Sequence, residues 1–384
     1  MSTAAVSQSR SRLDAIVVPA ARPSSALQNT INLSATMSVP LVVLCSRQTS
    51  VEQVADRVDK TLGARALVVE VPIGYEIPGR SLLTSAPEFQ EASAGRSSDL
   101  SVKRNLGLLL GRLRGWNKLL FVDDDISQLR PADIGRLSSL LDRHPVASMT
   151  TREYPDNSVV CHARRLAGFD QDIFVGGAVL GVHLRHPELS FFPDIYNEDW
   201  FFFARRAADR NLPKAGEVRQ LEYHPFADRE RAAREEFGDL LAEGLYALFE
   251  STAGWGFDDQ MALAAKQSYW TAFRSVRLAT IQETLDKLGL ERFDPEVADA
   301  EEALRRAAKQ AEGIDADLCV RYLEAWRQDA HSWQQGLPGP KSMASERQAL
   351  SELNLTNWIS CGYGASARER LNNSVRLRQL AKRS

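Results

Sequence analysis

The sequence predicts an α/β fold with a mostly parallel central sheet. Three observations carry this prediction. Short apolar runs recur in the first half of the chain, stretches of helical length separate them, and long helical stretches take over from about residue 229. Short apolar runs are typical of strands that are buried on both faces. Strands that alternate with helices form β-α-β units whose strands lie parallel. We therefore expect a helical region packed on an α/β part.

The first expected strands are short apolar runs with helices between them. We expect strands at residues 14–19, 40–45, 66–71 and 119–122. We expect helices at residues 24–35, 50–62 and 100–114, the last with Asp99 as its N-cap and Gly115 after its end. Gly107 and Gly111, one turn apart, predict close packing of that helix on the sheet. A loop rich in Gly, Pro and Ser at residues 72–98 is long enough to cover a site.

After the fourth strand the pattern stays mixed and then becomes helical. Strands are expected at 146–150, 158–164, 173–184 and 218–223, and helices at 131–141 and 197–210. Further helices are expected at 230–249, 258–288, 297–311 and 317–335. We divide the chain into a disordered N-terminus (1–12), an α/β domain (13–228), a helical region (229–364) and a basic tail (365–384). The tail is either a solvated end or a contact with an anionic acceptor or membrane surface.

Composition excludes several classes of protein. A formal charge of −3 over 384 residues gives no basis for a nucleic-acid binder. The four cysteines lie far apart and form no CxxC pair, so a disulfide framework or a zinc ribbon is not expected. The longest apolar run is too short to span a membrane, and the first dozen residues lack the apolar core of a secretory signal. We expect a soluble, cytoplasmic protein without a transmembrane segment.

A run of three aspartates is the strongest chemical signal. Asp123, Asp124 and Asp125 directly follow the strand expected at 119–122. Side chains alternate in an extended chain, so Asp123 and Asp125 should point one way and Asp124 the other. Two carboxylates about 5 Å apart repel each other by roughly 3 kcal/mol at an effective dielectric constant of about 20. The run therefore favours a bound cation, a cationic side chain or open water.

Two other strand ends should border the same crevice, because open α/β sheets bind ligands beyond the carboxyl ends of their strands. They are Pro19-Ala20-Ala21-Arg22 and Cys45-Ser46-Arg47. Carboxylate oxygens suit Mg²⁺ or Mn²⁺, and Mg²⁺ is held by one or two carboxylates plus substrate phosphates. We therefore expect a cation and a diphosphate there. Lys103 and Arg104 could add positive charge or could lie on a solvated helix face.

Two later features could complete the site. In Asn197-Glu198-Asp199-Trp200, a carboxylate could act as a general base, although an Asn cap followed by acidic residues is also a common helix start. His224 follows an expected strand and is the best of the six histidines as a metal ligand. A lone histidine is more often structural or exposed. An imidazole beside carboxylates would favour Mn²⁺ over Mg²⁺.

In this order, the features resemble the GT-A glycosyltransferases, and most closely family 2 and the glucosyl-3-phosphoglycerate synthase type. The resemblance covers about residues 14–226 and rests on five segments. They are Lys103-Arg104-Asn105-Leu106-Gly107, Leu120-Phe121-Val122-Asp123-Asp124-Asp125, Val175-Gly176-Gly177-Ala178, Glu198-Asp199 and His224. It implies a GT-A fold and a sugar donor attached to a nucleoside diphosphate. One departure is that Leu44-Cys45-Ser46-Arg47 lacks the acidic residue with which many members read the nucleotide base.

The resemblance also implies roles for individual residues. Asp123 would meet the ribose or the sugar and share the cation with Asp125 and His224. Asp199, beside Glu198, would be the base of an inverting enzyme. Gly176, Gly177 and Trp200 would border the sugar and acceptor pocket. The remaining donor-binding residues would be Pro19, Ala20, Ala21, Arg22, Lys103, Arg104, Asn105 and Asp124. We thus expect an Mn²⁺- or Mg²⁺-dependent glycosyltransferase with an unidentified hydroxyl acceptor, and the helical region could join two copies into a homodimer.

Three alternatives remain. A phosphohydrolase of the haloacid-dehalogenase type would use Asp123 as nucleophile, but that motif normally opens its domain, whereas three predicted strands precede it here. A non-catalytic nucleotide-sugar binder or scaffold would bind the donor without turnover. A nucleotidyltransferase is disfavoured because the Gly-rich, Arg-containing loop that such enzymes use is missing after Val18. A retaining outcome also stays open, since the sequence does not place the acceptor hydroxyl.

Overall fold

The computed structural model describes residues 12–152, 158–170, 175–289, 294–339, 343–362 and 369–370. The expected disordered N-terminus and basic tail therefore fall almost entirely outside the described residues. One mixed sheet has the strand order β10-β9-β3-β2-β1-β4-β7-β6-β8-β5. Its strands are β1 (Ala15–Ala20), β2 (Leu41–Cys45), β3 (Arg65–Glu70), β4 (Lys118–Val122), β5 (Ile126–Ser127), β6 (Val146–Arg152), β7 (Val175–His183), β8 (Lys214–Gln220), β9 (Trp358–Gly362) and β10 (Glu369–Arg370).

Strand directions bring many strand ends to one edge of the sheet. β3, β2, β1 and β4 run parallel to one another, and β7 runs antiparallel to both β4 and β6. β8 runs parallel to β6. The carboxyl ends of β1, β2, β4, β6 and β8 therefore share an edge with the beginning of β7. This confirms the predicted α/β class. The sheet is mixed rather than mostly parallel, because β7 and β9 pair antiparallel with their neighbours and β5 with β8.

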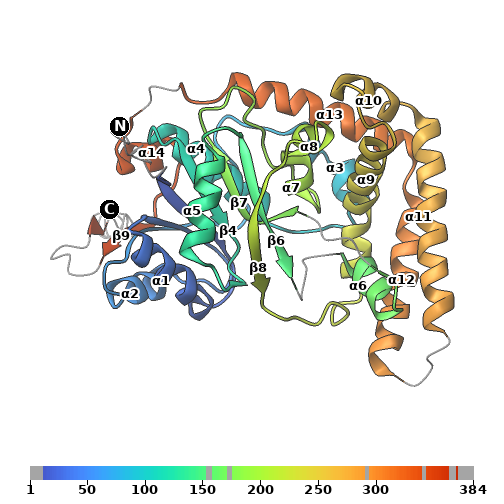
Figure 1. The fold of residues 1–384 in the computed structure, drawn as a ribbon, viewed down its shortest axis with the longest axis horizontal. Helices are drawn as coiled ribbons and strands as arrows, with labels where there is room; N and C mark the ends of the chain where they lie inside the picture. Colours follow the sequence, from blue (N-terminus) through green and yellow to red (C-terminus); the bar gives the residue numbers. More distant parts are fainter. Residues whose placement is uncertain are drawn as a thin grey trace, which may run out of the picture.

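Alternating side chains bury both faces of the central strands. Ile16 and Val18 pack in the cluster that contains α1 (Gln28–Met37), α2 (Val51–Asp59) and α5 (Pro131–Leu140). Ala15 and Val17 belong to the opposite cluster, together with α4 (Leu100–Leu113). Figure 1 shows α1, α2 and α5 beside the strands at the left of the molecule. Burial on both faces explains why these strands read as unbroken apolar runs.

Two glycines allow α4 to lie close against the sheet, as predicted. A Cβ atom at Gly107 would come within 2.7 Å of the Phe121 ring. A Cβ atom at Gly111 would come within 2.4 Å of Leu184 Cδ1. A side chain at either position would force its neighbours on the sheet to move, so the two glycines let α4 lie close to the strand that leads to Asp123.

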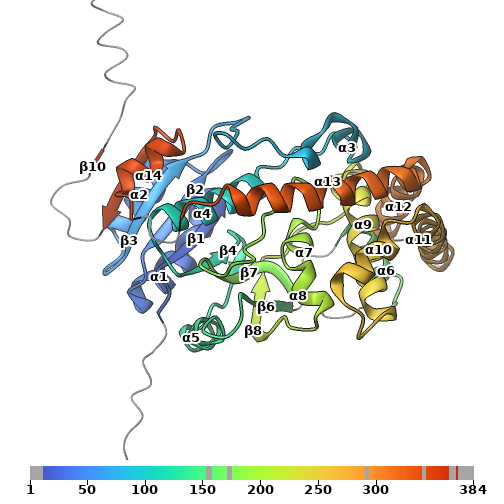
Figure 2. The same cartoon turned by 90° about the horizontal axis from the view of Figure 1, so that it is seen from above.

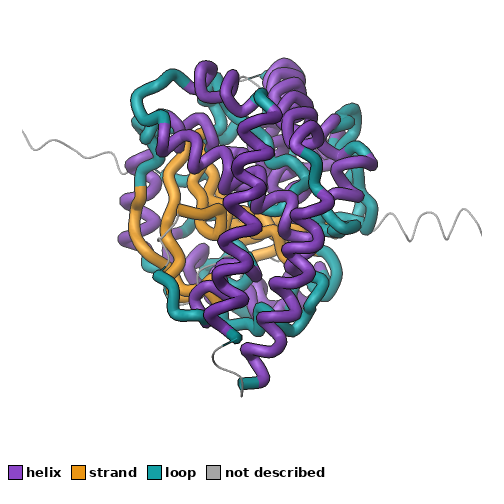
Figure 3. The backbone as a smooth tube through the Cα atoms, turned by 90° about the vertical axis from the view of Figure 1, so that its right-hand side faces the viewer, coloured by secondary structure: helices purple, strands orange, loops and turns teal. Residues whose placement is uncertain are grey.

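The C-terminal region is mainly helical and returns to the sheet. Its helices are α9 (Arg231–Ser251), α10 (Phe257–Ala264), α11 (Gln267–Leu288), α12 (Pro295–Gly313), α13 (Ala316–Gln335) and α14 (Glu346–Glu352). The long helices α11 and α12 lie against each other at the side of the molecule seen in Figure 3. In Figure 2, α13 runs back from them toward α4 and the sheet. β9 then pairs antiparallel with β3, so the expectation of a purely helical region is wrong at this strand.

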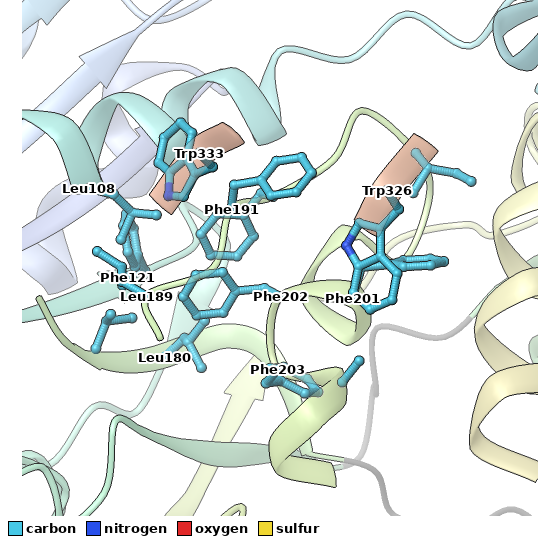
Figure 4. Packing of buried hydrophobic residues seen from close by; sticks show 14 of the residues in the cluster. Leu108, Phe121, Leu180, Leu189, Phe191, Phe201, Phe202, Phe203, Trp326 and Trp333 are labelled. Atoms are coloured by element: carbon cyan, nitrogen blue, oxygen red, sulfur yellow. The ribbon is translucent and has the colours of Figure 1, made fainter. Parts of the chain in front are cut away.

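Aromatic side chains join the sheet to the helical region. Phe192 stacks on Phe202 with their ring centroids 4.1 Å apart, and Phe201 meets Trp326 edge to face at 5.3 Å. Figure 4 shows these rings between the strands and the helix that carries Trp326 and Trp333. Residues of both parts of the chain belong to one hydrophobic cluster. Such a continuous core holds the helical region against the strand ends where the site lies.

Several predicted elements differ from the structure. Residues 158–164 form the helix α6 (Val159–Leu166) rather than a strand, because the Ser158 hydroxyl accepts from the Cys161 N–H at 3.3 Å and caps it. The helix predicted at 197–210 is interrupted at Phe203, whose backbone leaves the helical region. It forms α7 (Glu198–Phe202) and α8 (Ala204–Ala208). The helix predicted at 258–288 is split into α10 and α11, and the loop at 72–98 contains a 3₁₀ turn (Leu83–Ser85) and α3 (Pro87–Ala92).

Within the described ranges, none of the helices combines the length and the apolar character that crossing a membrane requires.

Candidate active site

A cavity of about 910 Å³ lies at the sheet edge where the strand ends meet. Residues that follow β1, β4 and β8, the end of β6 and the beginning of β7 form one wall, and residues of α6, α7 and α9 form the other. Residues 96–99, from the end of the long loop, also line it. The predicted site residues that it brings together are Pro19, Ala21, Arg22, Arg104, Asp123, Asp124, Asp125, Gly176, Gly177, Glu198, Asp199 and Trp200.

Asp124 organises the loop after β1. Its Oδ2 atom accepts hydrogen bonds from the backbone N–H groups of Ala21 at 2.7 Å and Arg22 at 2.9 Å, and its Oδ1 atom pairs with the Arg22 guanidinium. Asp124 therefore ties the end of β4 to the end of β1. The predicted alternation is not seen, because Asp124 and Asp125 lie in a turn, share Arg22 and line the cavity together with Asp123. Burial opposes the charge of Arg22, but the attraction of Asp125 and Asp124 outweighs it and raises the pKa of Arg22.

Arg104 joins the aspartate run to the Glu-Asp segment. Its Nη2 atom donates to both oxygens of Asp123, at 2.8 and 3.0 Å, and to the Gly177 carbonyl at 3.2 Å. Its Nη1 atom donates to Glu198 Oε1 at 2.6 Å. Burial disfavours the charged guanidinium, but the nearby carboxylates, Asp123 first, raise its pKa above the ordinary value. Arg104 is therefore a permanently charged bridge between α4, β4 and α7.

Asp125 is held from two sides. Its Oδ2 atom accepts from Gln220 Nε2 at 2.9 Å and lies 2.8 Å from Arg22 Nη2. Gln220 ends β8 and lines the cavity. The antiparallel pairing of β5 with β8 brings these two segments together, with Ile126 opposite Gln220. The side-chain direction of Asp125 is therefore set by residues nearly a hundred positions away on either side.

Glu198 and Asp199 differ in their burial and in their contacts. Glu198 is buried and bound to Arg104, whereas Asp199 lines the cavity with a partly exposed side chain. The Asp199 carboxylate accepts from the backbone N–H of Gly177, and through Oδ1 from that of Trp200 at 3.0 Å. A Cβ atom at Gly177 would lie 2.7 Å from Asp199 Cβ, so glycine is required for this approach.

The structure does not bring Lys103, Asn105 or Ala20 into the cavity lining. Lys103 is 1% exposed, and its Nζ atom donates to the Ala20 carbonyl at 2.8 Å and to Ser46 Oγ at 2.6 Å. Lys103 also forms an ion pair with Asp99 at 3.2 Å. The Asp99 side chain makes no capping hydrogen bond to α4, contrary to the prediction. Asn105 exchanges two hydrogen bonds with the Phe192 backbone, at 2.7 and 2.9 Å. Lys103 and Asn105 thus hold the strand ends and the approach to α7 rather than facing the cavity.

The structure does not bring His224 together with Asp123 and Asp125. His224 is exposed and is not among the residues that line the cavity. In the described part of the chain, no group of three or more His, Cys, Asp or Glu side chains is arranged to hold a metal ion. Asp123 and Asp125 do line the cavity, and a hard cation is held by one or two carboxylates together with substrate phosphates. These two carboxylates therefore fit a cation that is completed by a phosphate ligand, without His224.

The cavity carries an excess of negative charge. Among its described lining residues are nine carboxylates and six guanidinium groups, so three negative charges remain in excess. A cation inside the cavity would reduce this excess, and a diphosphate without one would increase it. The negative charge of the cavity lining therefore favours a bound cation, as do the carboxylate oxygens of Asp123 and Asp125.

The α9 wall contains a buried ion cluster that the sequence prediction missed. Arg277, 3% exposed, donates to both oxygens of Glu236 at 2.9 Å, to Asp239 at 2.8 Å and to Glu243 at 2.6 Å. Asp239 and Glu243 line the cavity. Burial, partly offset by Arg277, raises the pKa of Glu236 to about 7 and also raises that of Glu243. Asn197 donates to Asp239 at 2.8 Å instead of capping α7 with its side chain.

A spacing in the sequence could have revealed this wall. Residues 235, 239 and 243 are acidic and recur every four positions within a helix whose other residues are mostly apolar. A charged stripe that interrupts an apolar face is expected only where those charges meet partners or a cavity. Gln220 and Tyr246 carried no comparable signal, because a single amide or phenol has no pattern.

Comparisons with known proteins identify no family. No protein-family model matches the chain, and no curated protein matches it. Among solved structures, the chain is similar to the mannosyltransferase PcManGT from Pyrobaculum calidifontis, solved in complex with GDP-Man and Mn²⁺. The two share 12% sequence identity over 78% of this chain and 87% of that chain, with a TM-score of 0.35. A TM-score this low does not establish a common fold.

Proposed function

We propose that this protein is a glycosyltransferase of the GT-A type that transfers a sugar from a nucleoside-diphosphate sugar to an acceptor hydroxyl and requires a divalent cation. One observation carries this proposal. The aspartate run and the Glu198-Asp199 pair meet in one cavity at the carboxyl ends of parallel strands, where Arg104 binds both Asp123 and Glu198. Such an edge is the usual ligand site of open α/β sheets.

The donor half of the site is the sheet-edge wall. Asp124 holds the backbone of Ala21 and Arg22, which line the cavity and would border the nucleotide. Asp123 and Asp125 would hold Mg²⁺ or Mn²⁺, which when bound would neutralise charge on the diphosphate leaving group. Lys103 and Asn105 act indirectly in this proposal, because their contacts fix the strand ends and the Phe192 segment that leads to α7.

Asp199 is the proposed general base. The acceptor oxygen forms a bond to the anomeric carbon while the bond from that carbon to the diphosphate oxygen breaks and its electron pair leaves with the diphosphate. The acceptor proton passes to the Asp199 carboxylate, which the Gly177 and Trp200 N–H groups hold toward the cavity. A single displacement of this kind inverts the anomeric centre. Glu198 is bound to Arg104, so we assign it the positioning of that guanidinium rather than proton transfer.

The test is donor turnover with matched variants. UDP-, GDP- and ADP-sugars are offered to the full chain with and without Mn²⁺ or Mg²⁺, and nucleoside diphosphate release is measured. We expect cation-dependent release with at least one donor and a loss on the order of 100-fold in Asp125→Asn. Asp286→Asn is the control, because this exposed aspartate of α11 lies outside the cavity and an asparagine can still accept from Gln282.

Three outcomes would reject the proposal. Full activity without any divalent cation, retained in Asp125→Asn, would remove the metal role of the aspartate run. Phosphatase activity abolished by Asp123→Asn, without binding of any nucleotide sugar, would indicate the haloacid-dehalogenase alternative. Donor binding with no turnover in the presence of any acceptor would indicate the non-catalytic binder.

A further inference from the structure

We infer that the acceptor is a neutral polyhydroxy compound, such as a sugar or polyol, and that the α9 wall selects against acidic acceptors. This inference rests on the proposed function, because it concerns the half of the same cavity that faces the donor site. It names the acceptor class, which neither the aspartate run nor the Asp199 base determines.

The α9 wall presents carboxylates and aromatic rings together. Asp239, Glu243, Tyr246, Phe249 and Glu250 all come from α9 and line the cavity. Their spacing of three or four residues places them along one side of the helix. The opposite side of α9 is buried in the core through leucines. The helix thus offers the cavity a polar and aromatic strip instead of an apolar face.

Arg277 fixes the carboxylates from behind. It donates to Asp239 Oδ2 at 2.8 Å and to Glu243 Oε2 at 2.6 Å, but it is buried and does not line the cavity. Asn197 donates to the other oxygen of Asp239 at 2.8 Å. The Glu243 side chain is 30% exposed, so part of its carboxylate remains accessible. The Arg277 guanidinium thus holds the partly exposed Glu243 carboxylate at the cavity, whereas Asp239 is 2% exposed and has both oxygens bonded. The guanidinium itself is not available to an anion in the cavity.

Most of the cavity's arginines are bound to carboxylates. On the side of the α9 wall, Arg231 donates to Glu235 at 2.5 Å and lies 4.9 Å from the Tyr223 ring centroid. Arg96, in the long loop, pairs with Asp194 at 3.1 Å. Arg210, exposed at the end of α8, is the strongest candidate for binding an anion, and the test below includes it.

Aromatic side chains supply the second half of a sugar site. The rings of Trp200 and Tyr246 lie 4.4 Å apart, tilted by 44°, and the Tyr246 hydroxyl donates to the Trp200 carbonyl at 3.1 Å. Tyr196 and Tyr223 also line the cavity. Aromatic rings present apolar faces to C–H groups and polar tips to hydroxyls, whereas carboxylates only accept hydrogen bonds. A polyhydroxy compound offers C–H groups to the rings and O–H donors to the carboxylates. An ionised carboxylate or phosphate group offers the wall carboxylates no hydrogen-bond donor.

Repulsion between the wall carboxylates and an acidic acceptor makes the discrimination against such acceptors strong. A carboxylate or phosphate placed about 5 Å from one carboxylate in a partly buried site would bind on the order of 100-fold more weakly than its neutral counterpart. Rejection by unfavourable contacts is as effective a source of specificity as attraction. The same carboxylates hold hydroxyl donors through charge-assisted hydrogen bonds.

The experiment compares acceptors that differ only in an acid group. The wild-type chain, its preferred donor and a divalent cation are assayed with glucose against glucuronate, mannose against mannose 6-phosphate, and glycerol against glycerate. The readout is product formation, with nucleoside diphosphate release in the absence of acceptor measured separately. We expect the neutral member of at least one pair to be the better acceptor by at least 10-fold in kcat/KM. A better anionic member, particularly one whose use Arg210→Gln abolishes, would overturn the inference.

Variants connect the selectivity to α9. In Glu243→Gln the ratio of neutral to anionic acceptor use should fall by about 10-fold, because one negative charge leaves the wall while a hydrogen-bond acceptor remains. Glu324→Gln makes the same change on an exposed position of α13 outside the cavity and should leave the ratio unchanged. An unchanged ratio in Glu243→Gln would contradict the assignment. Donor turnover with no acceptor response in any pair would overturn the inference alone, whereas no donor turnover at all would also overturn the proposed function.

Discussion

The two walls of the cavity use carboxylates in different ways. At the sheet edge, Asp123 and Asp124 have guanidinium partners that also line the cavity, and Asp124 accepts backbone N–H groups as well. On α9, several buried carboxylates depend on a single guanidinium, Arg277, that lies behind them. At the sheet edge each of two guanidinium groups serves two carboxylates, whereas on α9 a single guanidinium serves three.

The difference has a physical consequence for protonation. Burial opposes the charge of Arg104, but the attraction of the nearby carboxylates, Asp123 first, raises its pKa, so this guanidinium stays charged. On α9, burial raises the pKa of Glu235 and of Glu236 to about 7 even though arginines oppose the shift. The sheet edge is thus suited to hold fixed charge, as a cation and a diphosphate require. On α9, the buried Glu235 and Glu236 behind the cavity lining therefore take up a proton more readily than an exposed glutamate does.

The largest expected effect is on the α9 wall. Arg277→Met removes the partner of three carboxylates and should lower the free energy of unfolding by about 3–5 kcal/mol at pH 8. Denaturant unfolding monitored by circular dichroism measures this change. Arg274→Met is the matched control on the same helix. Arg274 donates to the uncharged Ile314 carbonyl, so its replacement should cost about 1 kcal/mol.

The loss in Arg277→Met should also depend on pH. Without the guanidinium, the pKa values of the buried carboxylates rise further, so the folded variant takes up protons near neutral pH. A raised carboxyl pKa gives stability that is present at low pH and lost as pH rises. The deficit of the variant should therefore shrink as the pH falls from 8 to 5. A deficit that is constant over this range would contradict the shared role of Arg277.

His162 on α6 provides the opposite pH dependence beside the same wall. Burial first, and then the charges of Arg165 and Arg231, lower its pKa to about 4. A lowered histidine pKa means that the unfolded chain binds a proton between about pH 6.5 and 4 when the folded chain does not. Stability from this group is complete above pH 6.5 and should fall by about 3 kcal/mol by pH 4. His162→Gln should remove that slope, and an unchanged acid unfolding curve would contradict it.

Two adjacent glycines test the sheet edge. At Gly177 an added Cβ would lie 2.7 Å from Asp199 Cβ and 2.9 Å from Arg104 Nη1, whereas at Gly176 the nearest contact would be an ordinary 3.7 Å. Gly177→Ala should therefore cost about 1–3 kcal/mol of unfolding free energy and displace Asp199, with a loss of transfer activity. Gly176→Ala should leave both nearly unchanged. Equal behaviour of the two variants would show that the close approach to Asp199 is unimportant.

The strands were predictable because they are buried on both faces. The runs that became β1, β2, β3 and β4 hold apolar side chains on consecutive positions, and such runs identify themselves without neighbours. The strand predicted at residues 158–164 was wrong because the β-branched Val159 and Val160 favour a strand. The signals for a helix are the Ser158 cap and the arginines near the helix end. β9 was missed because its strand character depends on pairing with β3.

The site was predictable in its residue types and less so in its geometry. Strand order brings the ends of β1, β4 and β8 to one edge, so the aspartate run and Arg22 could be placed together from the chain alone. Whether Lys103 faces the cavity or the protein interior depends on contacts with Ala20 and Ser46, which no local pattern encodes. For the same reason the position of His224, exposed and outside the cavity lining, could not be predicted from the chain alone.

The central claim is that the aspartate run binds a cation together with a donor diphosphate. Isothermal titration calorimetry of the preferred nucleotide sugar, with and without saturating Mn²⁺, measures the coupling between the two ligands, which must be reciprocal. We predict that Mn²⁺ increases donor affinity by at least 10-fold in the wild-type chain and has little effect in Asp125→Asn. Equal donor affinity with and without the cation, or a coupling that survives in Asp125→Asn, would contradict the account.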